Sequence, residues 1–255
     1  MSDLEIVVMP HRGSSNETLE NSWQALEYVH SSGCKYFETD VHATADGVVV
    51  LYHDDNLKRM NKVDAKIEDL TWCELQKISY EDGSCIVRLD EALKRYNDIH
   101  FNIDLKHDLV VEPMIDLLNS MPEVCKRVCI ASFSARRVNK IRRVFDGKVK
   151  TSLSFSEVLR LKIASSVTIP PRFLGVPSMR QGVCYVQVPK KFGFVNVVTE
   201  RFIKNCHRYG LQIHVWVVNE REEMENLLDM GVDGLITDNL SVAKDVLSSR
   251  NLWVE

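Results

Sequence analysis

The feature that most constrains this chain is a regular alternation of short β-rich runs with stretches of helical spacing. Eight β-rich runs occur in the 255 residues, at positions 6–9, 36–42, 101–106, 128–133, 149–155, 185–189, 211–218 and 234–238. Helical spacing of apolar residues is found between most of them, as at 19–30, 110–120, 136–145, 199–208 and 220–230. Strand alternating with helix favours a parallel sheet, and eight such units in about 250 residues favour a closed (β/α)8 TIM barrel over an open doubly wound sheet.

Residues 48–90 interrupt this rhythm. The dipeptide Asp46-Gly47 is typical of a hairpin turn, and a further apolar run, VVVLYHD, and then a polar stretch follow it. We therefore expect a small insertion after the second barrel strand, lying over the mouth of the barrel. Because the sequence contains no internal repeat, low-complexity tract or linker, residues 1–255 are predicted to form a single domain.

The charge of the chain argues against one large class of function. A formal net charge of −4 at pH 7 provides no global positive field, so a protein that holds nucleic acid through its phosphate backbone is not expected. Any anion is therefore expected to be recognised locally. The Lys190-Lys191 pair is interpreted as a solvated face.

The first residues of the chain predict a cytoplasmic location. The start, MSDLEIVVMPHRG, has acidic residues where a secretory signal carries basic ones, and its apolar run is too short for a signal core or a membrane span. Seven cysteines form no Cys-x-x-Cys pair and are interpreted as reduced thiols. We expect no stable membrane insertion, and the sequence predicts no particular oligomeric state.

Acidic residues follow two of the predicted strands toward their carboxyl ends, where active sites of barrel enzymes lie. Glu38 and Asp40 are two positions apart, so both side chains point to the same side of the strand. Asp104 and Lys106 repeat that spacing on the next barrel strand. Three buried carboxylates would repel one another without a counter-charge, and oxygen ligands suit Mg²⁺ or Ca²⁺. The alternatives are a solvated strand end for the first pair and a structural ion pair for the second.

Two histidines stand where predicted strands end. His11 lies in the triplet His-Arg-Gly at the end of the first strand, and His53 lies in Tyr-His-Asp after the VVVL run. Histidine is the usual proton-transfer residue at neutral pH, and cleavage of a phosphodiester needs one group to accept a proton and another to donate one. Arg12 can fork onto phosphate oxygens, and Gly13 would let the backbone approach a ligand. The alternative for each histidine is a packed strand residue.

Three further residues are weaker candidates. His42 lies near the acidic pair but is expected to pack or to bond locally. His214 is expected to pack in the core, and Asp238, at the end of the last predicted strand, to hold a neighbouring loop.

The segments HRG, LEN and FETDVHATADGVVVLYHDDNLKR together resemble the opening signature of the glycerophosphodiester phosphodiesterase family. FNIDLK, HVWVVN and GVDGLITD follow in the order expected for that family, so the resemblance covers nearly the whole chain. Two positions depart from its pattern: Asp104 stands where glutamate is common, and Leu19 replaces a proline. Neither departure removes a chemical role.

The resemblance implies a (β/α)8 barrel that hydrolyses a small glycerophosphodiester to an alcohol and glycerol 3-phosphate. It also implies a site in which one divalent cation, Mg²⁺ or Ca²⁺, is held by Glu38, Asp40 and Asp104, His11 and His53 are the acid/base pair, Arg12 and Lys106 bind phosphate, and Trp216 lines the substrate pocket. Glu20 is expected to support the metal site or His11 from behind.

Two other functions stay open at this point. A phospholipase D-like enzyme of the same barrel group would act on lysolipids or sphingolipids; a long exposed apolar rim would favour it, whereas the hydrophilic stretch 54–69 argues against it. A catalytically silent barrel that binds a phosphorylated metabolite would be expected to have lost a histidine or a carboxylate of the set, and this sequence retains all five.

Overall fold

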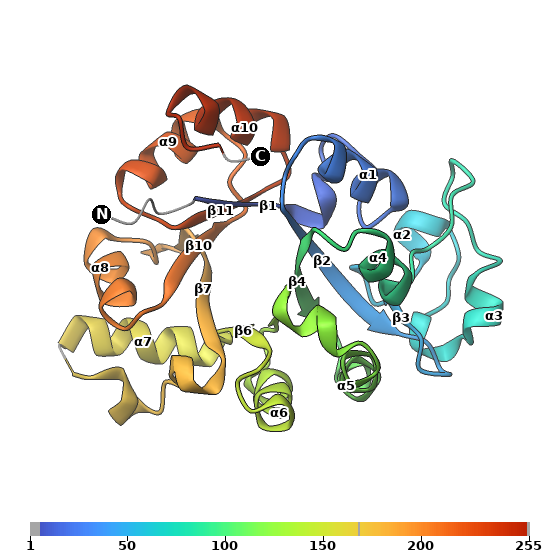
Figure 1. The fold of residues 1–255 in the computed structure, drawn as a ribbon, viewed down its shortest axis with the longest axis horizontal. Helices are drawn as coiled ribbons and strands as arrows, with labels where there is room; N and C mark the ends of the chain where they lie inside the picture. Colours follow the sequence, from blue (N-terminus) through green and yellow to red (C-terminus); the bar gives the residue numbers. More distant parts are fainter. Residues whose placement is uncertain (1–5, 168, 254–255) are drawn as a thin grey trace.

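The chain folds as an α/β protein whose strands curl around a common axis, with helices on the outside (Figure 1). The computed structural model describes residues 6–167 and 169–253. Its main sheet has nine strands in the order β1-β11-β10-β7-β6-β5-β4-β2-β3, and β8 and β9 form a separate hairpin. The strands are β1 (Val7–Pro10), β2 (Tyr36–Ala43), β3 (Val49–Leu51), β4 (His100–Leu105), β5 (Val128–Ala131), β6 (Lys150–Ser152), β7 (Val183–Pro189), β8 (Lys191–Phe192), β9 (Val195–Asn196), β10 (Gln212–Trp216) and β11 (Gly234–Thr237).

All eight predicted barrel strands are confirmed, and they pair in parallel with their sequence or spatial neighbours. The strand predicted at 149–155 was too long at its carboxyl end. Strand β6 stops at Ser152, because the Glu157 carboxylate accepts the backbone N–H of Ser154 at 2.8 Å and a helix begins at Phe155. At the two ends of the parallel set, β1 and β2 lie side by side, although no hydrogen-bonded ladder joins them within the described residues.

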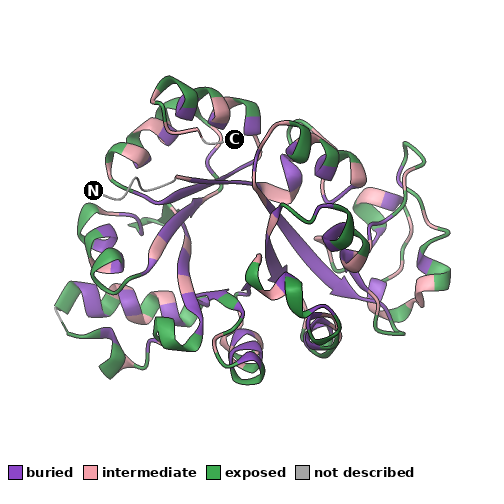
Figure 2. Ribbon diagram, in the orientation of Figure 1, coloured by how far each residue is buried: buried purple, intermediate pink, exposed green. Residues whose placement is uncertain are grey.

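Helices surround the sheet, and most of them bury one face against it, as the purple inner and green outer sides in Figure 2 show. They are α1 (Trp23–Ser31), α2 (Lys58–Asn61), α3 (Trp72–Leu75), α4 (Leu89–Arg95), α5 (Val111–Ser120), α6 (Ala135–Phe145), α7 (Phe155–Val167), α8 (Glu200–Arg208), α9 (Arg221–Asp229) and α10 (Leu240–Ser249). The five predicted helices are confirmed as α1, α5, α6, α8 and α9, with ends shifted by a few residues. Short 3-10 turns cover 11–13, 67–69, 108–110, 122–126, 171–174 and 179–181.

The segment between β2 and α4 has a small core of its own. It starts with β3, which pairs antiparallel with β2, and continues through α2 and α3. Its buried side chains are Val50, Tyr52, Leu57, Ile67, Leu75, Tyr80 and Ile86. In Figure 1 this segment lies beside β2 and α4, outside the ring of parallel strands. None of the helices in the described part of the chain has the length and apolar character needed to span a bilayer.

Candidate active site

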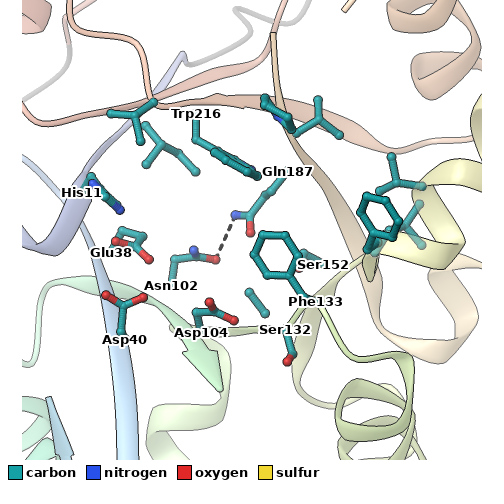
Figure 3. A pocket seen from close by; sticks show the side chains of 18 of the residues that line it. His11, Glu38, Asp40, Asn102, Asp104, Ser132, Phe133, Ser152, Gln187 and Trp216 are labelled. Carbon is teal, nitrogen blue, oxygen red and sulfur yellow. Dashed lines mark hydrogen bonds between the residues drawn. The ribbon is translucent and has the colours of Figure 1, made fainter. Parts of the chain in front are cut away.

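A cavity of about 360 Å³ lies among the carboxyl ends of the parallel strands. Its lining includes eight of the nine residues predicted for the site: His11, Arg12, Glu38, Asp40, His53, Asp104, Lys106 and Trp216. Figure 3 shows the His11 imidazole and the carboxylates of Glu38, Asp40 and Asp104 facing one space, with Trp216 and Phe133 toward its other side. The ninth residue, Glu20, stands outside the lining.

His11 is held by a residue from the far end of the chain. Because β1 pairs with β11, the ends of both strands meet, and His11 Nδ1 lies 2.7 Å from Asp238 Oδ1. Asp238 in turn accepts hydrogen bonds from Ser15 Oγ at 2.6 Å and Asn219 Nδ2 at 3.0 Å. Burial raises the pKa of Asp238, but these bonds outweigh it and lower that pKa to about 2. Burial by itself lowers the pKa of His11, but the hydrogen bond to Asp238 and the negative charge of Glu38 outweigh it, and the pKa of His11 is raised overall.

The backbone after His11 makes a tight left-handed turn. Arg12, Gly13 and Ser14 have φ values of 52°, 82° and 77°. A Cβ on Gly13 would lie 2.5 Å from the Ala25 Cβ and 2.7 Å from the Phe37 ring. Glycine is therefore needed here for close packing within the protein, whereas the sequence had predicted that it lets the backbone approach a ligand. The turn aims the Arg12 N–H at Glu38, whose Oε2 accepts it at 2.9 Å.

His53 is held in the same manner by its own neighbour in sequence. Its Nδ1 lies 2.6 Å from Asp54 Oδ1. Arg59 donates to Asp54 Oδ2 at 2.5 Å and to Glu20 Oε1 at 2.6 Å, and these interactions tie the β3 to α2 connection to the segment before α1. Both candidate acid/base histidines therefore have Nδ1 on a carboxylate, which leaves Nε2 for another partner.

The carboxylates come together because of the register of two strands. Parallel pairing places Asp40 of β2 opposite Asp104 of β4, and Lys106 Nζ lies 2.7 Å from Asp40 Oδ1 and 2.8 Å from Asp104 Oδ2. Burial and the charge of Asp40 raise the pKa of Glu38 to about 7. Burial also raises the pKa of Asp104. Burial lowers the pKa of Lys106, but the two aspartates outweigh it and raise that pKa.

The chemistry of this carboxylate cluster fits a hard cation. Asp40 Oδ2 is buried and accepts no hydrogen bond, although Arg12 Nε lies 3.1 Å away. A buried oxygen without a donor and a buried glutamate with a raised pKa both indicate negative charge that the protein only partly compensates. Within the described residues, however, no three His, Cys, Asp or Glu side chains are already arranged around one metal position. Lys106 is the cation between Asp40 and Asp104 in this arrangement.

Glu20 lies behind Arg12. Its Oε1 is 3.2 Å from Arg12 Nη1 and 2.6 Å from Arg59 Nη2. Since Arg12 also contacts Asp40, Glu20 is connected to the carboxylate cluster through this arginine. The Arg12 guanidinium is thus already placed between two carboxylates at the edge of the cavity.

Apolar side chains form the opposite wall of the cavity. Phe133 and Trp216 meet edge to face, with ring centroids 6.0 Å apart. Phe155 and Phe192 meet with centroids 5.5 Å apart, and all four line the cavity. Phe133 and Phe192 are each 61% exposed, so this wall continues into an open apolar rim. A long exposed apolar rim is the feature expected of an enzyme that acts on lysolipids.

Several site residues were not identified from the sequence. Asn102 and Gln187 line the cavity and are joined by a 2.9 Å hydrogen bond, drawn in Figure 3. Asn102 precedes Asp104 by two positions on β4, so the alternation that identified Asp104 could have identified it. Asp54 could have been found from its place after His53, whereas Phe133 lies beyond the end of β5.

The remaining candidates lie outside the cavity lining. His42 is buried and its Nε2 lies 3.3 Å from the His53 carbonyl oxygen. His214 is fully buried, its ring lies 4.7 Å from that of Tyr185, and burial lowers its pKa to about 3. Both therefore contribute to packing rather than to the cavity.

Comparison with known proteins gives a consistent result. Residues 11–242 match the Glycerophosphoryl diester phosphodiesterase family. The chain is 34% identical to a probable glycerophosphodiester phosphodiesterase 2 of Mycobacterium tuberculosis, over 97% of this chain and 92% of that protein. It is 23% identical to a lysophospholipase D of Rattus norvegicus, over 94% and 86% of the two chains. A phosphodiesterase of Oleispira antarctica, solved in complex with the product sn-glycerol-3-phosphate, has a similar fold with a TM-score of 0.76 at 18% identity, over 95% and 96% of the chains.

Proposed function

Because the chain belongs to the glycerophosphoryl diester phosphodiesterase family, we propose that the cavity at the strand ends is its catalytic site. The protein is an enzyme that hydrolyses glycerophosphodiesters to an alcohol and glycerol 3-phosphate. The observation that carries the assignment of the site is the convergence of two imidazoles and three carboxylates on one cavity. We also propose that the curled sheet is a closed (β/α)8 barrel. Residues 48–90 would then be an insertion after the second barrel strand.

Glu38, Asp40 and Asp104 are the proposed ligands of one divalent cation, Mg²⁺ or Ca²⁺. Their oxygen donors suit a hard ion, and Asp40 Oδ2 accepts no hydrogen bond although Arg12 Nε lies 3.1 Å away. When bound, the cation would stabilise negative charge that develops on the phosphate. Lys106 would share the aspartates with it, so its ammonium group would become available to a phosphate oxygen.

His11 and His53 are the proposed acid/base pair. One imidazole accepts the proton of the attacking hydroxyl or water as the new P–O bond forms, and the other donates a proton to the alcohol oxygen as the old P–O bond breaks. Asp238 and Asp54 favour this role because each fixes Nδ1 of its histidine, and Asp238 also stabilises the protonated ring of His11. Arg12, held by Glu20, would bind a second phosphate oxygen.

A lysophospholipid is the second candidate substrate, and the apolar wall favours it. A glycerophosphodiester without an acyl chain is polar throughout, whereas Phe133, Phe155 and Phe192 offer an apolar surface that starts inside the cavity. An acyl chain lying along these rings would remove apolar area from water. The amphipathic substrate would then place its phosphate on the polar wall and its chain on the rim.

The test is release of glycerol 3-phosphate, or of its acylated form, from matched substrates with and without an acyl chain. We expect turnover that a chelator abolishes and that added Mg²⁺ or Ca²⁺ restores. His11→Ala and His53→Ala should each abolish turnover while thermal unfolding stays cooperative. If the purified protein binds glycerol 3-phosphate but cleaves neither substrate with any divalent ion, it is a silent phosphometabolite-binding barrel and the proposal fails.

A further inference from the structure

The stretch of chain from 155 to 208 has a charge opposite to that of the whole protein. It contains nine lysines and arginines against two glutamates, whereas the full chain has a net charge of −4. One of the glutamates, Glu157, is buried and paired with Arg142. The other, Glu200, lies 3.4 Å from Lys204. This stretch, which forms α7, β7, the β8–β9 hairpin and α8, is therefore a basic region on an acidic protein.

The same stretch exposes an apolar stripe along α7. Phe155, Leu159 and Ile163 are spaced four residues apart and so lie along one side of the helix. They are 47%, 52% and 47% exposed, while Leu161 and Ala164 on the other side are buried. A surface helix usually exposes its polar side and buries its apolar one. Helix α7 instead carries apolar side chains on its buried side and on its exposed side.

The β8–β9 hairpin continues this stripe. Residues 191–196 are all exposed, and Phe194 at the turn has no cover at all. The Phe192 ring packs on Phe155, and Lys162 of α7 donates to the Val197 carbonyl at 2.6 Å, so the hairpin and the helix are held together. We call Phe155, Leu159, Ile163, Phe192, Phe194 and Val195 the α7–hairpin face.

We propose that the α7–hairpin face docks on a lipid surface that carries anionic headgroups. Contiguous exposed apolar side chains on a water-soluble surface indicate an interaction site, and aromatic residues at a turn can enter the boundary between headgroups and acyl chains. Lys191 at its border and the excess of lysine and arginine over 155–208 indicate the charge of the partner, because anionic lipids attract basic residues near the membrane. Lys191 begins the exposed hairpin and has no ion-pair partner within the described residues, while Lys190 is paired with Glu223.

The α7–hairpin face lies beside the cavity, so docking on a lipid surface would bring the cavity close to lipid headgroups. Phe155 and Phe192 belong both to the face and to the cavity lining. A lipid lying in the surface could therefore move its headgroup toward the polar wall while its chain stays on apolar side chains. This consequence rests on the proposed function, whereas the docking itself does not.

Sedimentation with sucrose-loaded vesicles tests the proposal. One set contains phosphatidylcholine alone and the other phosphatidylcholine with phosphatidylglycerol. The wild-type protein is expected to sediment with the anionic vesicles, and with the neutral ones about tenfold less, and raised salt should release it. The double variant Phe194→Ser/Leu159→Ser should lose most of this binding. Val144→Ser on α6 removes an apolar residue that is 46% exposed elsewhere, and it should bind like the wild type.

Neither Phe194 nor Leu159 lines the cavity, so the double variant should hydrolyse a chain-free glycerophosphodiester at the wild-type rate. That measurement separates a loss of docking from a loss of catalysis. Equal sedimentation of wild type and double variant, or of anionic and neutral vesicles, would overturn the proposal. So would a fall in molecular mass of the double variant in solution, because the face would then be an interface between two copies of the chain.

Discussion

Nδ1 of His11 lies 2.7 Å from Oδ1 of Asp238, although the two residues are 227 positions apart in the chain. The contact exists because the first and last strands of the main sheet pair with each other, with Pro10 opposite Thr237. His53 reaches the same arrangement with the residue that follows it, Asp54. Asp238 therefore reaches His11 through strand pairing, whereas Asp54 reaches His53 because it is the next residue in the chain.

Replacing Asp238 with asparagine should lower the pKa of His11. In the wild type that pKa is raised, so protonated His11 stabilises the folded state below its ordinary pKa, and this contribution is lost as the pH rises through the raised value. Without the carboxylate, burial would act with less opposition and the neutral ring would be favoured. Titration of the His11 ring by NMR measures the change, and kcat should fall by about 10- to 100-fold because the ring is less well oriented.

The matched control is Asp54→Asn, which removes the corresponding carboxylate beside His53 and should leave the titration of His11 unchanged. If the His11 pKa is unchanged in Asp238→Asn, or if both variants shift it equally, Asp238 does not set the protonation of His11.

The sequence was sufficient for the parallel strands and for eight of the residues around the cavity, of which Trp216 was predicted from the family resemblance and the others from local patterns as well. Alternation on a strand identified Glu38 and Asp40, and the His-Arg-Gly triplet identified His11. Asp238 was expected only to hold a loop, because its contact with His11 depends on the pairing of β1 with β11, strands that are distant in sequence and that no local pattern brings together. Helix α7 carries apolar residues on two sides, so its sequence lacks the one-sided stripe from which helices are predicted. The expected cytoplasmic location stays a prediction.

Asp40→Asn should weaken binding of Mg²⁺ or Ca²⁺ strongly. The change keeps the size of the side chain but removes the charge of a carboxylate that has one unsatisfied oxygen. Calorimetric titration of the metal-free protein should show at least about a tenfold loss of affinity relative to wild type. Asp46→Asn, which alters a carboxylate that accepts the Trp72 N–H at a turn outside the cavity, is the control and should bind the ion normally. Equal affinities in the two variants would remove Asp40 from the cation site.

Lys106→Met should destabilise the protein most when divalent ions are absent. The ammonium group lies within 2.8 Å of both Asp40 and Asp104, and its removal leaves two carboxylates facing each other in a largely buried place. The loss should be about 3 kcal/mol in the free energy of unfolding, measured with a chelator present. Added Mg²⁺ should recover more stability in this variant than in the wild type, because the ion would replace the missing charge. A variant that is equally unstable with and without Mg²⁺ would contradict a shared role of Lys106 and the cation.

Gly13→Ala should lower the free energy of unfolding through backbone strain and through steric overlap. Gly83→Ala has the strain without the overlap, so comparing the two variants separates these effects. Both glycines have a φ close to +83°, where a Cβ is strained by about 1–2 kcal/mol. Around Gly83 the space is open, whereas at Gly13 the new methyl group would press on Ala25 and Phe37. We therefore expect Gly83→Ala to lose about 1–2 kcal/mol and Gly13→Ala to lose about 1–3 kcal/mol more, by denaturant unfolding. Because Gly13 shapes the turn that directs the Arg12 N–H to Glu38, its variant should also lose turnover, while Gly83→Ala should keep it. Equal losses of stability at the two positions would mean that the turn after His11 yields to the extra methyl group without strain.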